Sequence, residues 1–99
     1  MPRDVEFHPR AIEEARAVRR WDAARSDAAA TPFMLELDRA MGRVTSTPET
    51  GAPSLHGTRP HRIRRSPYFV IFREIGTALQ VVAIAHAKRR PGYWKRRLA

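Results

Sequence analysis

Apolar residues recur at a helical spacing in two stretches of the first half of the chain. Residues 10–25 contain no Gly or Pro and predict a first helix. Its apolar stripe consists of positions three residues apart, namely Ile12, Ala15 and Val18, with Trp21 as a weaker continuation. The charged positions between them are expected on the opposite, solvent-facing side, namely Glu13, Glu14, Arg16, Arg19 and Arg20.

A second stretch carries the most regular helical pattern in the chain. One face of the predicted helix is apolar and consists of Phe33, Leu37, Ala40, Met41 and Val44. Two starts are compatible with the sequence. In one, Ser26 or Asp27 caps the helix and Pro32 lies inside it. In the other, Thr31 is the N-cap and Pro32 is the first helical residue. We favour the early start, with a kink or a non-helical first turn, and expect the two helices to form a hairpin.

Strand patterns occupy most of the remaining sequence. A short strand at residues 5–7 ends before Pro9, because proline cannot donate to a sheet ladder. Residues 45–58 contain two Pro and two Gly and predict a loop. Three further strands are predicted at residues 59–65, 68–74 and 79–86. The last two are joined by a hairpin turn at residues 74–77, where Gly76 can adopt a positive φ.

The order of these elements is β-α-α-β-β-β, which predicts an α+β fold. The helical hairpin is expected to pack on one face of a small, largely antiparallel sheet. We expect residues 1–99 to form a single domain, with a basic C-terminal tail at residues 87–99. In that tail Pro91-Gly92 is a break, and Tyr93-Trp94 could begin a last helical turn. The residues expected to be buried between hairpin and sheet are Leu37, Met41, Phe72 and Val82.

Composition excludes several classes of protein. The chain has 99 residues and no Cys, so disulfide scaffolds, thiolate zinc sites and cysteine nucleophiles are excluded. Its apolar runs are too short to span a bilayer, and its first residues lack the apolar stretch of a signal peptide. We therefore expect a small soluble cytoplasmic protein with no membrane partner.

Charge is distributed very unevenly along the chain. Residues 1–58 carry 8 basic and 9 acidic side chains, whereas residues 59–99 carry 11 basic side chains and one acidic one, Glu74. A half-chain with a net charge of +10 indicates a polyanionic partner, which could be nucleic acid, an anionic membrane or an acidic protein. The alternative is that the charge only keeps the protein soluble.

Phosphate chemistry is the most specific activity that these residues suggest. His86 ends a predicted strand and is followed by Lys88, Arg89, Arg90 and Tyr93. A metal-free ribonuclease needs a group that transfers protons near neutral pH and cations that stabilise phosphate charge. The alternative is that His86 only hydrogen-bonds the backbone where the strand meets the tail. We expect no metal, because the four histidines are scattered, namely His8, His56, His61 and His86. We also expect no cofactor, because Gly51 and Gly57 lie in a loop without the Gly-Lys-Ser/Thr sequence of a phosphate-binding loop.

Aromatic residues offer a second kind of contact. Tyr68, Phe69 and Phe72 could stack on bases, but burial in the core is the favoured interpretation. Trp94 lies in the most basic segment, where contact with a partner and packing are equally compatible with the sequence.

The ordered set of segments resembles toxins of the RelE/ParE superfamily from bacterial type II toxin–antitoxin operons. The matching segments are Leu37-Asp38-Arg39-Ala40 in the hairpin, the loop Pro48-Glu49-Thr50-Gly51, the strands Tyr68-Phe69-Val70-Ile71-Phe72-Arg73 and Val82-Ala83-Ile84-Ala85-His86, and the tail Arg89-Arg90-Pro91-Gly92-Tyr93-Trp94. The resemblance implies a growth-inhibiting toxin that is neutralised by a small, usually DNA-binding antitoxin.

The superfamily divides by target, and the resemblance favours one branch. RelE-like members cut mRNA on the ribosome, whereas ParE-like members poison DNA gyrase. Phe69 stands where RelE-like enzymes commonly carry an arginine, and Tyr93 lies farther beyond the strand than their catalytic tyrosine. We therefore expect a gyrase inhibitor without catalysis of its own, with ribosome-dependent mRNA cleavage as the alternative. A simple nucleic-acid-binding module is a third, less favoured class.

Each alternative predicts its own functional residues. A ribonuclease would use His86, Arg90 and Tyr93 as catalytic residues. The residues expected to bind the target are Arg62, Arg64, Arg65, Lys88, Arg89, Arg90, Tyr93 and Trp94. In this interpretation the tail is a separable binding segment, so deleting residues 93–99 is expected to abolish toxicity without unfolding the domain.

Overall fold

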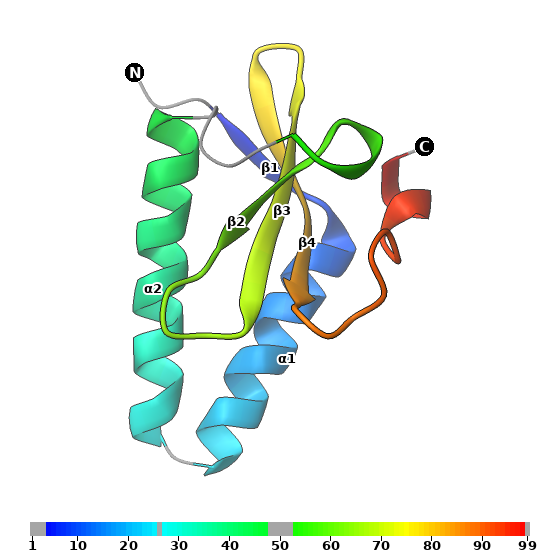
Figure 1. Cartoon of the computed structure of the whole chain (residues 1–99). Helices are drawn as coiled ribbons and strands as arrows, with labels where there is room; N and C mark the ends of the chain where they lie inside the picture. Colours follow the sequence, from blue (N-terminus) through cyan, green and yellow to red (C-terminus); the bar gives the residue numbers. More distant parts are fainter. Residues whose placement is uncertain (1–3, 26, 48–52, 99) are drawn as a thin grey trace.

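The computed structural model describes residues 4–25, 27–47 and 53–98. Along the chain the elements are β1 (Val5–Phe7), α1 (Pro9–Arg25), α2 (Asp27–Ser46), the short 3₁₀ turn η1 (Leu55–Gly57), β2 (Arg59–Arg62), β3 (Tyr68–Ile75), β4 (Ala78–His86) and the 3₁₀ turn η2 (Lys95–Leu98). The predicted order β-α-α-β-β-β is confirmed (Figure 1).

The four strands form one sheet in the order β1-β4-β3-β2. The pairs β2–β3 and β3–β4 are antiparallel, and β1 runs parallel to β4. The predicted largely antiparallel sheet is therefore confirmed. β3 and β4 are joined by the predicted hairpin turn, in which Gly76 has a φ of 57° that L side chains rarely adopt.

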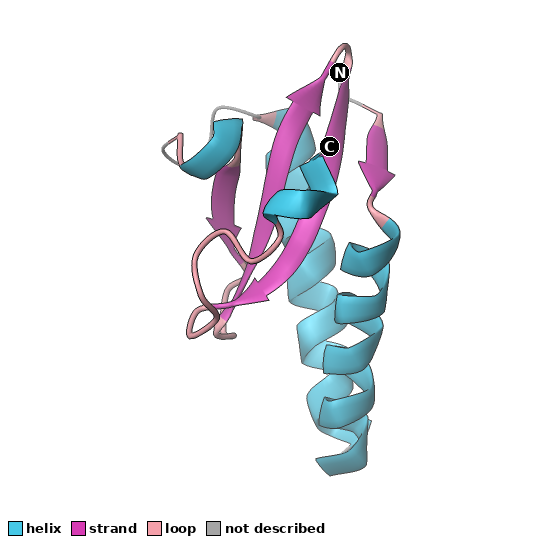
Figure 2. Ribbon diagram, turned by 90° about the vertical axis from the view of Figure 1, so that its right-hand side faces the viewer, coloured by secondary structure: helices cyan, strands magenta, loops and turns pink. Residues whose placement is uncertain are grey.

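Both helices cover the same face of the sheet, as Figure 2 shows from the side. The apolar stripe of α2 turns toward the strands, and Leu37 is only 6% exposed. Met41 is partly buried against this core, whereas Phe72 of β3 is fully buried in it. The predicted burial between the hairpin and the sheet is thus confirmed for Leu37 and Phe72, and it is confirmed in part for Met41.

The opposite face of the sheet carries a second cluster, which we call the tail-face cluster. It consists of Ile71, Val82, Ala83, Ala85 and Trp94. Ile71 pairs with Ala83 but Phe72 pairs with Val81, so Val82 is an extra residue in β4. Such a bulge changes the alternation of side chains along a strand. Val82 is buried as predicted, but its predicted place between hairpin and sheet is wrong.

The predicted inner face of α1 is wrong at both ends. Ile12 is 37% exposed and Trp21 is 60% exposed, whereas Ala11 is completely buried. A step of three residues turns a helix by about 300°, so a stripe with this spacing drifts around the helix. The buried face instead follows Ala11 and Val18, and Glu14 lies on that side rather than toward solvent.

Several predicted boundaries also shift. The early start of α2 is confirmed, but the helix begins directly at Asp27, without a non-helical first turn, and it extends to Ser46, into the predicted loop. β2 ends at Arg62 rather than at residue 65, because Arg65 lies in a turn with a φ of 63°. The loop segment at residues 48–51 lies outside the described residues. In the described part of the chain, no helix is long and apolar enough to cross a membrane.

Candidate functional site

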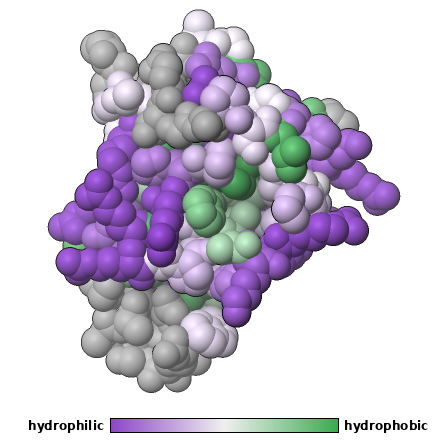
Figure 3. All heavy atoms as spheres, in the orientation of Figure 1, coloured by the Kyte–Doolittle hydropathy of each residue, from purple (hydrophilic) through white to green (hydrophobic). Residues whose placement is uncertain are grey.

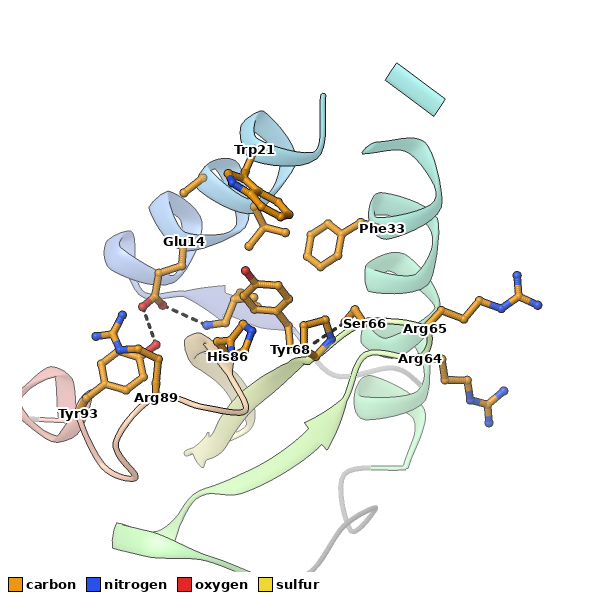
Figure 4. A pocket seen from close by; sticks show the side chains of 14 residues that line it. Glu14, Trp21, Phe33, Arg64, Arg65, Ser66, Tyr68, His86, Arg89 and Tyr93 are labelled. Atoms are coloured by element: carbon orange, nitrogen blue, oxygen red, sulfur yellow. Dashed lines mark hydrogen bonds between the residues drawn. The ribbon is translucent and has the colours of Figure 1, made fainter. Parts of the chain in front are cut away.

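A pocket of about 800 Å³ lies between the two helices, the β2–β3 turn and the end of β4 (Figure 4). We call it the hairpin pocket. Its walls come from α1, α2, the turn between β2 and β3, the end of β4 and the first part of the tail. The size is typical of pockets that bind small ligands or single side chains of a partner.

Aromatic rings line the centre of the hairpin pocket. The Tyr68 ring meets the Phe33 ring edge to face at 5.9 Å and the His86 ring at 5.0 Å. The His86 Nδ1 accepts a hydrogen bond of 3.0 Å from the Lys88 backbone N–H, so in the neutral ring the proton is on Nε2. Trp21 closes the far wall (Figure 4). His86 is therefore held by packing on one side and by a backbone contact on the other.

Cationic side chains surround this aromatic centre. Arg64 and Arg65 belong to the β2–β3 turn, and their side chains point away from the pocket in Figure 4. Ser66 fixes the turn, since its Oγ donates to the Ile63 carbonyl oxygen at 2.9 Å. On the opposite side the guanidinium of Arg89 lies 3.9 Å from the centre of the Tyr93 ring, a cation–π contact.

Glu14 of α1 gathers three donors from distant parts of the chain. The Tyr93 hydroxyl donates to its Oε2 at 2.6 Å, and the Ile84 backbone N–H donates to its Oε1 at 3.1 Å. Arg97 donates to both carboxylate oxygens, at 2.7 and 3.0 Å. This bidentate geometry is the strongest form of a carboxylate–guanidinium pair.

These contacts change the pKa values of the groups involved. Burial alone would raise the pKa of Glu14, but the hydrogen bonds from Arg97, Tyr93 and Ile84 outweigh it and the pKa is lowered. Burial and the hydrogen bond to Glu14 raise the pKa of the Tyr93 hydroxyl far above its usual value. Tyr93 is therefore poorly suited to lose a proton at neutral pH.

A second histidine contact joins α2 to the sheet. His61 of β2 accepts a hydrogen bond of 3.1 Å from Nε of Arg43 through its Nε2. Burial lowers the pKa of His61, and the charges of Arg43 and Arg64 lower it further. The imidazole is neutral in this arrangement, because a protonated ring could not accept the bond.

The structure brings together some of the predicted site residues and separates others. His86, Arg64, Arg65, Arg89 and Tyr93 all line the hairpin pocket. The other predicted residues do not, namely Arg62, Lys88, Arg90 and Trp94. The three cations among them are exposed, whereas Trp94 is only 5% exposed and packs in the tail-face cluster. This burial agrees with the packing interpretation of Trp94.

Phe69 lies on the face of the sheet that the helices leave uncovered. Its cross-strand neighbours are Ala85 on β4 and Arg62 on β2. Figure 3 shows this face, with hydrophobic side chains in a shallow central hollow and hydrophilic ones on both sides. Phe69 packs against the tail-face cluster and so belongs to the apolar part of this face.

Sequence reasoning missed Glu14, which was placed on the solvent side of the first helix. A signal was available, because Glu14 lies three residues after Ala11 and four before Val18 and so shares their face. A carboxylate within an apolar stripe needs a partner, and the surplus of arginines in the tail could supply one. Within the described residues there is no group of three or more His, Asp or Glu side chains that could hold a metal ion.

Solved structures show that this is the fold of the RelE/ParE toxins. The chromosomal ParDE toxin–antitoxin system from P. aeruginosa is 17% identical over 85% of this chain and 95% of that one, with a TM-score of 0.75. A mutant of the E. coli toxin RelE in the free state is 19% identical over 89% of this chain and 86% of that one, with a TM-score of 0.62. No curated protein matches the sequence significantly.

The family itself follows from the sequence. The model of the ParE toxin of the type II toxin–antitoxin system parDE matches residues 5–91, which is most of the chain. The chain belongs to the ParE toxin family, and it is a toxin of a type II toxin–antitoxin system.

Proposed function

We propose that this ParE-family toxin arrests growth by binding and inhibiting DNA gyrase, without catalysis of its own. The observation that carries the proposal is the hydrogen bond of 2.6 Å from the Tyr93 hydroxyl to Glu14. It engages the hydroxyl of Tyr93, which the ribonuclease hypothesis assigns as a catalytic residue. Binding to a macromolecular target needs only a well-presented surface, which the exposed cations provide.

The other residues of the ribonuclease hypothesis support the same conclusion. Phe69 replaces the expected arginine on the open face of the sheet. His86 is packed against Tyr68 and holds the Lys88 amide, as a histidine with a structural role would. Target binding is instead assigned to six exposed cations, which are Arg62, Arg64, Arg65, Lys88, Arg89 and Arg90. Tyr93 and Trp94 would contribute by holding the tail in place.

Ribosome-dependent mRNA cleavage is the second candidate function. One observation favours it, since His86 lines the same pocket as Arg89, Arg64 and Arg65. A histidine with cations nearby is a minimal set for cleaving a phosphodiester bond. Of these three arginines, however, the Arg64 and Arg65 side chains point away from the pocket in Figure 4. In a ribonuclease Arg90 and Tyr93 would complete the catalytic set, but Arg90 does not line the pocket.

We also propose a cognate antitoxin as the partner that neutralises this toxin. The similar P. aeruginosa structure is described as a ParDE toxin–antitoxin system. An antitoxin segment with acidic and apolar side chains would suit this chain, because residues 59–99 carry a net charge of +10. A short neighbouring gene that encodes a ribbon-helix-helix pattern would support this partner.

The two functions can be separated with the variant His86→Gln. We expect it to retain most of the growth arrest and the gyrase-dependent DNA cleavage of the wild type, because His86 is a packed residue in the favoured mechanism. A ribonuclease would lose about 10²–10⁴-fold in rate with its proton-transfer group. Primer-extension mapping of mRNA is the parallel measurement. Codon-linked cuts that disappear in His86→Gln would overturn the gyrase proposal.

A further inference from the structure

The edge of β4 is only partly covered by β1. The parallel pairing runs from Val5–Leu79 to Phe7–Val81, and the His8 backbone N–H then donates to the Val81 carbonyl oxygen at 2.9 Å. After His8 the chain turns into α1 at Pro9. β4 continues to His86, and among the described residues no strand lies beside it on this edge after Val81. Backbone N–H and C=O groups at such an edge must form hydrogen bonds with groups other than a neighbouring strand.

Two side chains form the hydrogen bonds to β4 that a longer β1 would have formed. Glu14 accepts the Ile84 N–H at 3.1 Å, and Nη1 of Arg97 donates to the Val82 carbonyl oxygen at 3.0 Å. The acceptor comes from α1 and the donor from the tail, and the two are joined to each other at 2.7 Å. We call this arrangement of Glu14 and Arg97 the edge bridge. It continues the ladder of β4 with one acceptor and one donor, as a strand would.

The edge bridge is also connected to the mouth of the hairpin pocket. The second carboxylate oxygen of Glu14 holds the Tyr93 hydroxyl, and the Tyr93 ring carries the guanidinium of Arg89 at 3.9 Å. Arg97 lies 5.2 Å from the centre of the same ring. One carboxylate on α1 is thus linked through Tyr93 to an exposed cation of the tail.

We propose that Glu14 is a positioning residue, which closes the open edge of β4 together with Arg97 and, through Tyr93, fixes Arg89 at the hairpin pocket. The importance of Arg89 for toxicity rests on the proposed function. The contacts themselves do not, so they can be tested on the isolated protein.

The arrangement has a fixed polarity, which distinguishes it from an ordinary surface ion pair. The Ile84 N–H needs an acceptor from α1, and the Val82 carbonyl needs a donor from the tail. Exchanging the charges in the double variant Glu14→Arg/Arg97→Glu would place a donor against a donor and an acceptor against an acceptor. The exchanged pair should therefore fail to restore the edge, whereas a simple ion pair would be restored.

The first test is amide hydrogen exchange of Ile84, measured by NMR. We expect exchange to be at least about tenfold faster in Glu14→Leu than in the wild type, because the amide loses its acceptor. Glu14→Gln keeps an acceptor oxygen and should largely preserve the protection. The matched control is Glu13→Leu, since Glu13 is exposed and lies one residue away on the same helix. Equal protection of Ile84 in Glu14→Leu and the wild type would overturn the proposal.

The second test follows the side-chain protons of Arg89. Because its guanidinium lies over the Tyr93 ring, these protons should be shifted upfield by the ring current in the wild type. We expect the shift to disappear in Tyr93→Leu and to decrease strongly in Glu14→Gln and Arg97→Gln, with Arg96→Gln as the matched control for exposed charge. Unchanged Arg89 shifts in both Glu14→Gln and Arg97→Gln would contradict the positioning role, even if Glu14→Leu does not fold.

Growth arrest is the third measurement, and it separates the two proposals. If the Ile84 and Arg89 signals change as expected and toxicity falls with them, both proposals are supported. If the signals change but gyrase inhibition is absent even in the wild type, only the proposed function fails. If toxicity persists in Glu14→Gln while the Arg89 shift is lost, Arg89 placement has no part in target binding and that half of the inference is wrong.

Discussion

Two leucines of α2 show how strongly one helix separates core from surface. Leu37 is 6% exposed and belongs to the core, whereas Leu35 is 47% exposed. We predict that Leu37→Ala lowers the free energy of unfolding by about 2–5 kcal/mol, the usual range for a leucine removed from a packed core. The measurement is urea denaturation at neutral pH.

Leu35→Ala is the matched control, because it removes the same atoms from the same helix. It should change the free energy of unfolding by no more than about 0.5 kcal/mol, which is typical of a surface position. Similar losses in both variants would mean that the helix faces are assigned incorrectly.

The two tryptophans should report opposite environments. Trp94 is 5% exposed and packs in the tail-face cluster, whereas Trp21 is 60% exposed at the hairpin pocket. In the variant Trp21→Phe the remaining emission comes from Trp94, and we predict that it is blue-shifted and poorly quenched by iodide. In Trp94→Phe the remaining emission should be red-shifted and readily quenched. Strong quenching in Trp21→Phe would show that the Trp94 side chain is not packed in the tail-face cluster.

His61 should make the stability of the fold depend on pH. Its pKa is lowered in the folded state by burial and by Arg43 and Arg64, so the folded protein binds a proton less readily than the unfolded chain. The contribution of His61 is fully present above the ordinary histidine pKa and is lost as the pH falls through the lowered value. We therefore predict a decrease of stability between about pH 7 and pH 5. His61→Gln should flatten this part of the curve, and an unchanged slope would contradict the assignment.

At the scale of elements, the tail is part of the folded domain. Trp94 is buried in the tail-face cluster, with Tyr93 and Leu98 packed against it. The His56 ring from η1 meets the Trp94 ring edge to face at 6.0 Å, and Arg97 holds Glu14 of α1. These contacts contradict the expectation that residues 93–99 can be removed without unfolding the domain.

We predict that deleting residues 93–99 destabilises the whole domain, because the deletion uncovers the tail-face cluster and removes the edge bridge. Thermal unfolding followed by circular dichroism is the measurement. The double variant Lys88→Gln/Arg90→Gln removes two exposed charges of the same segment and should unfold at nearly the wild-type temperature. A truncated protein that unfolds at the wild-type temperature would show that residues 93–99 do not stabilise the domain.

Most elements of this fold could be predicted from periodicity, because each buries one continuous face. β3 and β4 were found nearly to the residue, and so was the core face of α2. Val82 was placed on the wrong face because a bulge depends on pairing between two strands, which a single strand pattern does not contain. Ile12 and Trp21 were misplaced because a step of three residues and a step of 3.6 diverge within a few turns.

The candidate site was less predictable than the fold. Its basic residues were predicted from the concentration of charge in residues 59–99, and five of the predicted site residues line one pocket. Glu14 was missed because its three donors lie 70 to 83 residues away in sequence. Contacts between residues so far apart in the sequence depend on the tertiary structure. Only the position of Glu14 within an apolar stripe indicated that it has buried partners.

At the scale of the whole molecule, charge separates the two halves of the chain. Residues 59–99 carry a net charge of +10, whereas residues 1–58 carry a net charge of −1. We predict that association with the cognate antitoxin becomes slower as the ionic strength rises, because long-range attraction is screened, while dissociation changes less. Surface-binding kinetics at several salt concentrations is the measurement. An association rate that does not depend on salt would show that these charges do not steer binding.

The parallel pairing of β1 with β4 has a consequence for the order of folding. β1 is synthesised first, but its partner residues follow only at Leu79–Val81, after both helices and the other strands. At about 5–20 residues per second, the ribosome takes several seconds to make the intervening chain. β1 remains without its partner throughout this interval, and closing such a long loop slows folding relative to a helical protein of the same size. A nascent toxin therefore completes its sheet only after β4 has emerged from the ribosome.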